Sequence, residues 1–125
     1  MIDSRTKRIL VVDDEPDILE FLRDILEEEG YVVTTDKGEY AERLAGESHP
    51  DLILLDVLLS GRDGRQIVAF LKSQRATEHI PVIMLSAHPS AANTSRAAGA
   101  DDFLAKPFEI DHLLVKITRH LTGNM

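Results

Sequence analysis

The sequence contains no cysteine, which excludes a disulfide framework, a thiol nucleophile and a thiolate metal site. Its five histidines form no ligand pair at helical spacing. No apolar run approaches the roughly 18 residues of a membrane span. Residues 1–7 are polar and lack the apolar core of a signal peptide. We therefore expect a cytoplasmic protein that does not associate with membranes.

Positive charge is scarce, because 14 lysines and arginines face 22 aspartates and glutamates, for a net charge of -8. This balance argues against direct binding to nucleic acid, where phosphate repulsion would have to be overcome. With 125 residues the chain can build one hydrophobic core but not two. We expect a single domain over residues 1–125, with a core at about residues 7–121 and no output domain.

Short apolar runs predict strands that are buried on both faces, as in the centre of a parallel sheet. These runs, and two weaker strand patterns, lie at residues 9–12, 31–35, 52–56, 82–85 and 102–105. Helical periodicity predicts helices between them, at residues 16–29, 39–45, 64–74, 90–98 and 110–121. Phe21 belongs to the expected apolar stripe, Phe70 is expected to face inward, and Gly46 is expected to end the second helix. Strict alternation predicts a five-stranded parallel sheet with helices on both faces.

Polar residues stand where these strands end. Asp13 and Asp14 follow the first strand, Asp56 and Ser86 end two others, and Lys106 follows the last. Because parallel strands present their carboxyl ends at one edge of the sheet, we expect all five residues to share one crevice. Taken singly each has an ordinary explanation: the two aspartates or the serine as helix caps, Asp56 as the start of a turn, and the lysine as a solvated side chain.

Three carboxylates crowded in a crevice repel one another, and a hard divalent cation relieves that repulsion. Mg²⁺ takes oxygen ligands and keeps several waters, which suits a few carboxylates and an incoming phosphate. Lys106 adds a positive charge and Ser86 a hydroxyl donor. The set therefore suits a phosphoryl group whose oxygens are stabilised while a carboxylate attacks phosphorus.

Six short motifs occur in a fixed order and spacing along the chain. They are Val-Val-Asp-Asp-Glu at 11–15, Pro-Asp-Leu-Ile-Leu-Leu-Asp at 50–56, Asp63-Gly64, Ser86-Ala87, Gly-Ala-Asp-Asp-Phe at 99–103 and Lys106-Pro107-Phe108. In these motifs the sequence resembles the receiver domain of bacterial two-component response regulators, of the stand-alone type. The resemblance implies a flavodoxin-like, doubly wound (βα)5 sandwich.

The resemblance also implies roles for individual residues. Asp56 would be the phosphoacceptor, and Asp13, Asp14, Asp56 and the backbone carbonyl of Leu58 would hold Mg²⁺, for which Mn²⁺ can substitute. Lys106 would contact the phosphoryl group and act in its transfer with Asp56 and Ser86.

Further roles follow from the same resemblance. Ser86 occupies the position of a switch hydroxyl, and Phe103 that of a switch aromatic, with an ordinary core aromatic as the alternative. A cis peptide bond is expected between Lys106 and Pro107. Ser60 stands where many members have proline, so we expect a looser loop after the phosphoacceptor.

As a receiver, the protein would be phosphorylated by a histidine kinase or a histidine phosphotransfer domain. It would not be an enzyme, since it would catalyse only its own phosphorylation and dephosphorylation. The signal would reach a downstream protein partner through the face formed by residues 90–98, 102–105 and 110–121. The same face is a candidate dimer interface. The alternative to a stand-alone protein is a receiver excised from a longer protein.

Three alternatives compete with this interpretation. A phosphatase that forms an aspartyl phosphate would need a second acid two residues after its nucleophile, where this chain has Leu58. A nucleotide-binding module would need a glycine-rich loop after the first strand, where residues 13–16 offer carboxylates instead. A receiver-like interaction scaffold that is never phosphorylated stays open.

Overall fold

Five parallel strands form a sheet in the order β2-β1-β3-β6-β7. The structure is a computed structural model that describes residues 6–122, so the ends of the expected domain, residues 1–5 and 123–125, lie outside the described residues. The strands of the sheet are β1 (Arg8–Val12), β2 (Val32–Asp36), β3 (Leu52–Asp56), β6 (Val82–Ser86) and β7 (Asp102–Ala105). The helices are α1 (Pro16–Glu28), α2 (Ala41–Ser48), α3 (Gly64–Lys72), α4 (Ala91–Ala97) and α5 (Ile110–Leu121). This order confirms the predicted doubly wound, flavodoxin-like fold.

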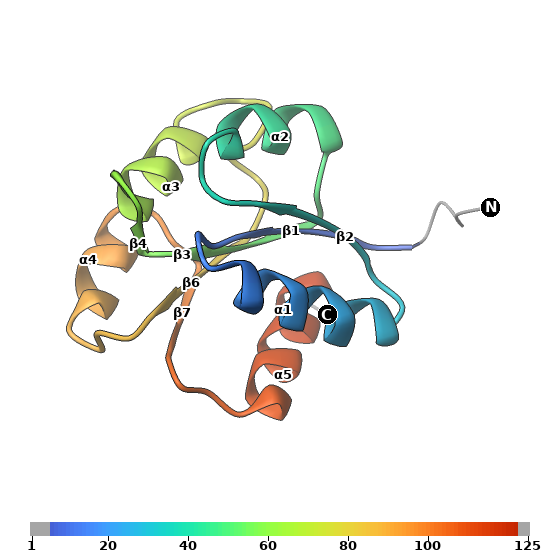
Figure 1. Cartoon of the computed structure of the whole chain (residues 1–125). Coiled ribbons are helices and arrows are strands. Elements are labelled where there is room, and N and C mark those ends of the chain that lie inside the picture. The colour runs from blue at the N-terminus through green and yellow to red at the C-terminus, as the bar shows by residue number, and fades with distance from the viewer. Residues whose placement is uncertain (1–5, 123–125) are drawn as a thin grey trace.

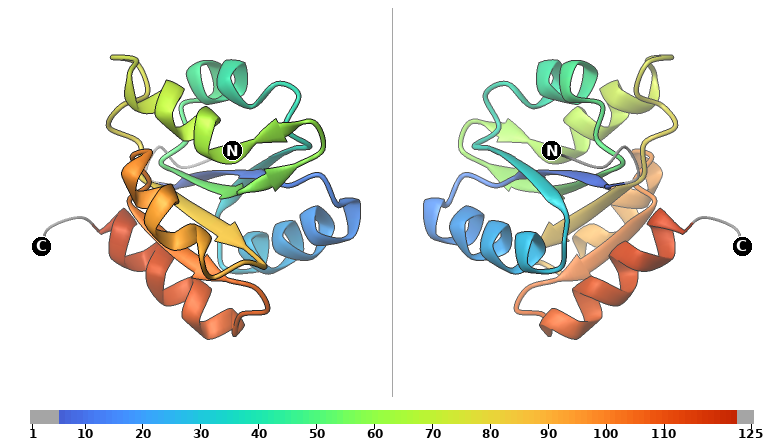
Figure 2. Two further views of the ribbon diagram at one scale, coloured as in Figure 1. Left: turned by 90° about the vertical axis from the view of Figure 1, so that its left-hand side faces the viewer. Right: turned by 90° about the vertical axis from the view of Figure 1, so that its right-hand side faces the viewer.

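The helices cover both faces of the sheet, with α1 and α5 on one side and α2, α3 and α4 on the other (Figures 1 and 2). Each face has its own apolar core. In β3, Ile53 and Leu55 pack toward α2 and α3, whereas Leu52 and Leu54 pack toward α1 and α5. Because both faces of this central strand are covered, every one of its residues is buried. Among residues 6–122, no helix combines the length and apolar character needed to cross a membrane.

Two phenylalanines that the helical periodicity assigned to the core are exposed. Phe21 in α1 and Phe70 in α3 keep 49% and 48% of their surface accessible. Both predictions were wrong because the apolar residues in these helices form a stripe broader than the buried face. In α3 that face is set by Ile67, Val68 and Leu71, and at about 100° per residue Phe70 lies to one side of it.

The second helix does not end at Gly46, as the sequence suggested. It continues to Ser48, whose hydroxyl donates a hydrogen bond to the carbonyl of Leu44. A single glycine costs a helix only about 1 kcal/mol and does not stop it. The helix ends instead at His49, which adopts a left-handed conformation (φ 49°) and is followed by Pro50.

The segment after β3 was expected to be a loop, but it contains a small antiparallel hairpin. Its strands are β4 (Leu58–Leu59) and β5 (Arg62–Asp63), joined by Ser60 and Gly61. Gly61 takes a positive φ of 75°, a conformation that favours glycine. The hairpin lies directly between the end of β3 and the start of α3, so it borders the carboxyl edge of the sheet.

Candidate functional site

The carboxyl ends of β1, β3 and β7 bring two acids and a lysine together. Asp13 follows β1 and is fully buried, and Asp56 is the last residue of β3 and 7% exposed. The Lys106 ammonium lies 2.9 Å from Asp13 Oδ2 and 3.5 Å from Asp56 Oδ2. Lys106 and Asp13 are 93 positions apart in the chain, so only the parallel sheet makes them neighbours.

Asp14 completes a group of three carboxylates with the right chemistry for a hard cation. One oxygen each from Asp13, Asp14 and Asp56 lies within 4.8 Å of the other two. An all-oxygen donor set of carboxylates suits Mg²⁺ or Mn²⁺ and gives no preference for softer metals. Three such residues leave coordination positions for water, phosphate and a backbone carbonyl, for which Leu58 stays a prediction. The donor set therefore fits the expected cation.

The surroundings of Asp56 disfavour the ionised form of its carboxyl group. Burial is the main cause that raises its pKa, to about 6, and the negative charge of Asp13 adds to the increase. Lys106 and the backbone N–H of Leu58 act in the opposite direction. Asp56 therefore ionises at a higher pH than an ordinary aspartate, and an additional positive charge beside it would lower its pKa again.

The ammonium group of Lys106 responds to the same surroundings. Burial alone would lower its pKa, but the hydrogen bond and charge of Asp13, together with Asp56, outweigh burial and raise the pKa above the ordinary value. Lys106 therefore stays protonated and supplies a fixed positive charge at the carboxyl edge of the sheet. The peptide bond between Lys106 and Pro107 is cis.

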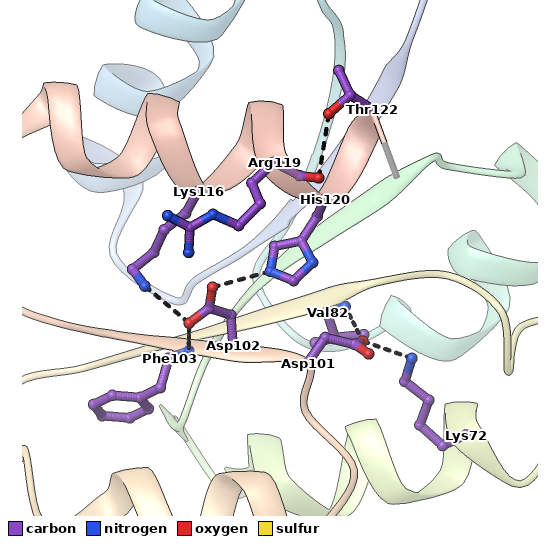
Figure 3. A network of polar contacts seen from close by, with 9 residues as sticks. All are labelled: Lys72, Val82, Asp101, Asp102, Phe103, Lys116, Arg119, His120 and Thr122. Atoms are coloured by element: carbon purple, nitrogen blue, oxygen red, sulfur yellow. Dashed lines mark hydrogen bonds and ion pairs between the residues drawn. The ribbon is translucent and has the colours of Figure 1, made fainter. Parts of the chain in front are cut away.

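Ser86 and Phe103, the two predicted switch residues, lie on the neighbouring strands β6 and β7. Ser86 is 1% exposed at the end of β6, where its hydroxyl oxygen accepts a hydrogen bond of 3.0 Å from the N–H of His88. Phe103 in β7 is 9% exposed and belongs to the core beneath α2, α3 and α4. Figure 3 shows its ring directed away from α5. The structure places Ser86 at the carboxyl edge of the sheet and Phe103 in the core three residues before Lys106, and their switch roles stay predictions.

Gly64 has a steric reason to be glycine. It begins α3, its N–H donates a 2.7 Å hydrogen bond to the carbonyl of Val57, and a Cβ at this position would lie 2.2 Å from the backbone oxygen of Asp56. Any larger residue would push the end of β3 out of place. The Asp63-Gly64 motif thus positions Asp56, and Asp63 itself caps α3 by accepting the N–H of Arg65 at 2.9 Å.

A small pocket of about 220 Å³ opens beside Ser86. Its walls include Leu58, Arg65, His88 and Thr94. Leu58 is 54% exposed. Arg65 in α3 donates a 2.9 Å hydrogen bond to the hydroxyl of Thr94 in α4, and this bond connects the two helices along one wall of the pocket. The residues two positions after Asp56 and two positions after Ser86 therefore share one opening.

Two polar contacts were missed from the sequence, and the first concerns Ser60. Its N–H and hydroxyl donate hydrogen bonds of 2.9 Å and 2.7 Å to Asp14 Oδ2. The serine therefore ties the hairpin turn to an acid of the site. The expectation of a looser loop than with proline stays a prediction. The replacement of a common proline by serine was the available signal.

The second missed contact is a network around Asp102, a buried acid in β7. Its carboxylate lies 3.0 Å from Lys116 Nζ and 3.0 Å from His120 Nε2, and Figure 3 shows both α5 side chains turned toward it. Burial raises the pKa of Asp102, but the bonds to His120 and Lys116 outweigh burial and hold that pKa below its usual range. Lys116 and His120 thus fasten α5 to the sheet.

The fold and the site together define a doubly wound α/β domain whose acids and lysine meet at the carboxyl edge of the sheet. Comparison with known proteins gives the family. The sequence matches the response regulator receiver domain over residues 9–118. The chain therefore belongs to the receiver domain family of two-component response regulators.

Individual relatives agree with this assignment. The phosphate regulon transcriptional regulatory protein PhoB of Escherichia coli (strain K12) is 40% identical over 114 residues, which are 89% of this chain and 50% of PhoB. A solved structure of a putative response regulator from Chloroflexus aurantiacus J-10-fl has a TM-score of 0.89 at 33% identity, covering 94% of this chain and 99% of that one. The chain spans about half the length of the curated relatives it matches.

A third relative was solved in a modified form. It is a response regulator from Burkholderia pseudomallei described with a phosphorylated aspartic acid, a calcium ion and citrate. The two structures share a TM-score of 0.82 at 26% identity, over 93% of this chain and 69% of that one.

Proposed function

We propose that Asp56 accepts a phosphoryl group from a phosphohistidine of a histidine kinase or histidine phosphotransfer domain. An oxygen of the Asp56 carboxylate attacks phosphorus, the phosphorus–nitrogen bond breaks, and the histidine nitrogen keeps the electron pair and takes up a proton. The product is an acyl phosphate on Asp56. The chain is then a switch that catalyses only its own phosphorylation and dephosphorylation, and hydrolysis of the acyl phosphate by water returns the Asp56 carboxylate and releases inorganic phosphate.

One observation carries this proposal: the buried carboxylate of Asp56 ends the central strand β3 within 3.5 Å of the Lys106 ammonium and in a group with the carboxylates of Asp13 and Asp14. A nucleophile must be ionised, and burial works against ionisation of Asp56, whose pKa is raised to about 6. A divalent cation held by Asp13, Asp14 and Asp56 would supply the positive charge that favours the carboxylate form and neutralises phosphoryl oxygens. The Burkholderia relative with a phosphorylated aspartate supports the same chemistry.

Lys106 has a role that its own contacts support. Its protonated ammonium is held by Asp13 at 2.9 Å and lies within 3.5 Å of Asp56. An acyl phosphate on Asp56 brings new anionic oxygens to this position, so the lysine can pair with them in place of Asp13. Lys106 directly follows β7, so its movement acts on the strand that carries Phe103.

The output is proposed to pass through the α4, β7 and α5 face, to a downstream protein partner or to a second copy of the chain. Ser86 would turn its hydroxyl toward the phosphoryl group, and its present bond from the His88 N–H would be given up. Phe103 would move with it, since Ser86 pairs with Ala105 on β7, two residues after Phe103. This transmission is a shift between two pre-existing conformations.

Intact mass spectrometry tests the proposal. The protein is incubated with Mg²⁺ and acetyl phosphate, and the wild type should gain a single phosphoryl group that is absent without Mg²⁺. Asp56→Asn should gain none, because an amide is not a carboxylate nucleophile. The matched control is Asp51→Asn, next to the other end of β3, where the Asp51 carboxylate accepts the N–H of Arg8 at 2.8 Å. Full phosphorylation of Asp56→Asn would refute the assignment.

A further inference from the structure

Ser60 holds Asp14 by two hydrogen bonds that end on the same oxygen. Its N–H lies 2.9 Å and its hydroxyl 2.7 Å from Asp14 Oδ2, across a separation of 46 positions in the chain. Among the described residues, 6–122, no hydrogen bond to the other oxygen, Oδ1, is formed. One oxygen of Asp14 is therefore fixed by the protein, while the other is available to a further ligand.

The hairpin that carries Ser60 is held in place by contacts on both sides. Arg62, next in the hairpin after Gly61, donates a 2.7 Å hydrogen bond to the carbonyl of Gly38 and forms an ion pair with Glu42 in α2. On the other side, Asp63 caps α3. The turn that carries Ser60 is thus held between two helices. Asp14, by contrast, lies on the partly exposed connection between β1 and α1.

We propose that Ser60 is a positioning residue for Asp14 as a ligand of the divalent cation, and that it sets the affinity of the site for that cation. The inference rests on the proposed metal role of Asp14. A ligand already held in its binding orientation loses less rotational freedom when the cation arrives. Donated hydrogen bonds also draw electron density from the oxygen that accepts them. Here both fall on Oδ2, so Oδ1 would be the oxygen that binds the cation.

Three substitutions of Ser60 remove different numbers of its hydrogen-bond donors and should therefore change the Mg²⁺ affinity by different amounts. Ser60→Ala removes the hydroxyl and keeps the N–H; Ser60→Pro removes both donors, because proline has no N–H; Ser60→Thr keeps both. Partners that orient a metal ligand typically contribute 10- to 100-fold in affinity, and for this partly exposed pair we expect the lower end, about tenfold for Ser60→Pro. Ser60→Ala should lose less, and Ser60→Thr should match the wild type.

The measurement is isothermal titration calorimetry with Mg²⁺ alone, without a phosphodonor. Ser73→Ala serves as a matched control, since its hydroxyl donates a 2.6 Å bond to the Phe70 carbonyl at the end of α3. Thermal midpoints in EDTA run in parallel. A residue that only stabilised the hairpin would lower the midpoint in EDTA and leave the Mg²⁺ affinity of the folded protein unchanged.

The expected order of Mg²⁺ affinity is wild type and Ser60→Thr, then Ser60→Ala, then Ser60→Pro. Equal or tighter binding by Ser60→Ala or Ser60→Pro overturns the inference. If Ser60→Pro does not fold, the comparison of Ser60→Ala with Ser60→Thr decides. Failure of the proposed function is a different result: a wild type that binds no Mg²⁺ and gains no phosphoryl group refutes both, whereas a phosphorylated wild type with a flat Ser60 series refutes only this inference.

Discussion

Lys106 is closer to Asp13 than to Asp56: its ammonium nitrogen lies 2.9 Å from the first carboxylate and 3.5 Å from the second. The lysine that is proposed to contact the phosphoryl group is therefore held mainly by an acid that is not the phosphoacceptor. An acyl phosphate on Asp56 would compete with Asp13 for this positive charge.

Asp13→Asn should lower the pKa of Asp56 below its present value of about 6. Two causes act in the same direction: the negative charge that raises the pKa is removed, and Lys106 is left to pair with Asp56 alone. A titration of the Asp56 side-chain carbon by NMR, without Mg²⁺, measures the change. An unchanged or higher pKa would show that the negative charge of Asp13 does not raise the pKa of Asp56.

Lys106→Ala should allow some phosphorylation yet uncouple it from the conformational change, because the lysine joins the phosphoryl position to β7. Amide spectra recorded with and without beryllofluoride, a phosphoryl mimic, provide the measurement. Shifts in α4 and α5 should be much smaller than in the wild type and in Lys7→Ala, which replaces an exposed lysine before β1. Wild-type shifts in Lys106→Ala would reject the role.

Asp56→Asn should stabilise the metal-free protein at pH 7 by roughly 3 kcal/mol, from a pKa shift of about two units. A carboxyl group whose pKa is raised in the folded state stabilises it below the unfolded pKa, near 4, and loses that contribution as pH rises through the folded value of about 6. The advantage of asparagine should therefore grow between these values and vanish at pH 4. Urea unfolding in EDTA across this range measures it, and a gain independent of pH would argue against a raised pKa.

Leu58→Asn should speed loss of the phosphoryl group. Leu58 is 54% exposed and lines the same small pocket as Ser86 and His88, so its apolar side chain can shield the approach of water. A polar side chain can instead hold that water, and a several-fold faster rate corresponds to roughly 1 kcal/mol of barrier. Dephosphorylation time courses after donor removal test this against Leu58→Met. An equal or slower rate in Leu58→Asn would show that this side chain does not control the water.

Asp102→Asn should destabilise the fold by roughly 2 kcal/mol, because it removes a buried charge and leaves Lys116 and His120 without their anionic partner. Since the pKa of Asp102 is lowered in the folded state, its contribution is present above the unfolded value near 4 and is lost as pH falls through the folded one. A double-mutant cycle with Lys116→Met, by urea unfolding, isolates the pair. Additive losses would indicate that the two residues act independently.

The sequence alone determined the layered fold and the main members of the site. Short apolar runs that alternate with amphipathic helices require a parallel sheet, and a parallel sheet collects its carboxyl ends at one edge. That step places Asp13, Asp56 and Lys106 together without knowledge of any distance. Because it depends only on local patterns and strand direction, it could be made before the structure was known.

The tertiary structure decided how these groups are held. Whether Phe70 faces the core depends on where the sheet surface lies under α3, and helical periodicity does not contain that information. Ser60 and Asp14, or Asp102 and His120, become partners only when separate elements pack together, and the hairpin that aims Ser60 depends on Arg62 reaching α2. Local sequence fixes the direction of each strand and helix, whereas contacts between distant polar side chains depend on the final packing of all of them.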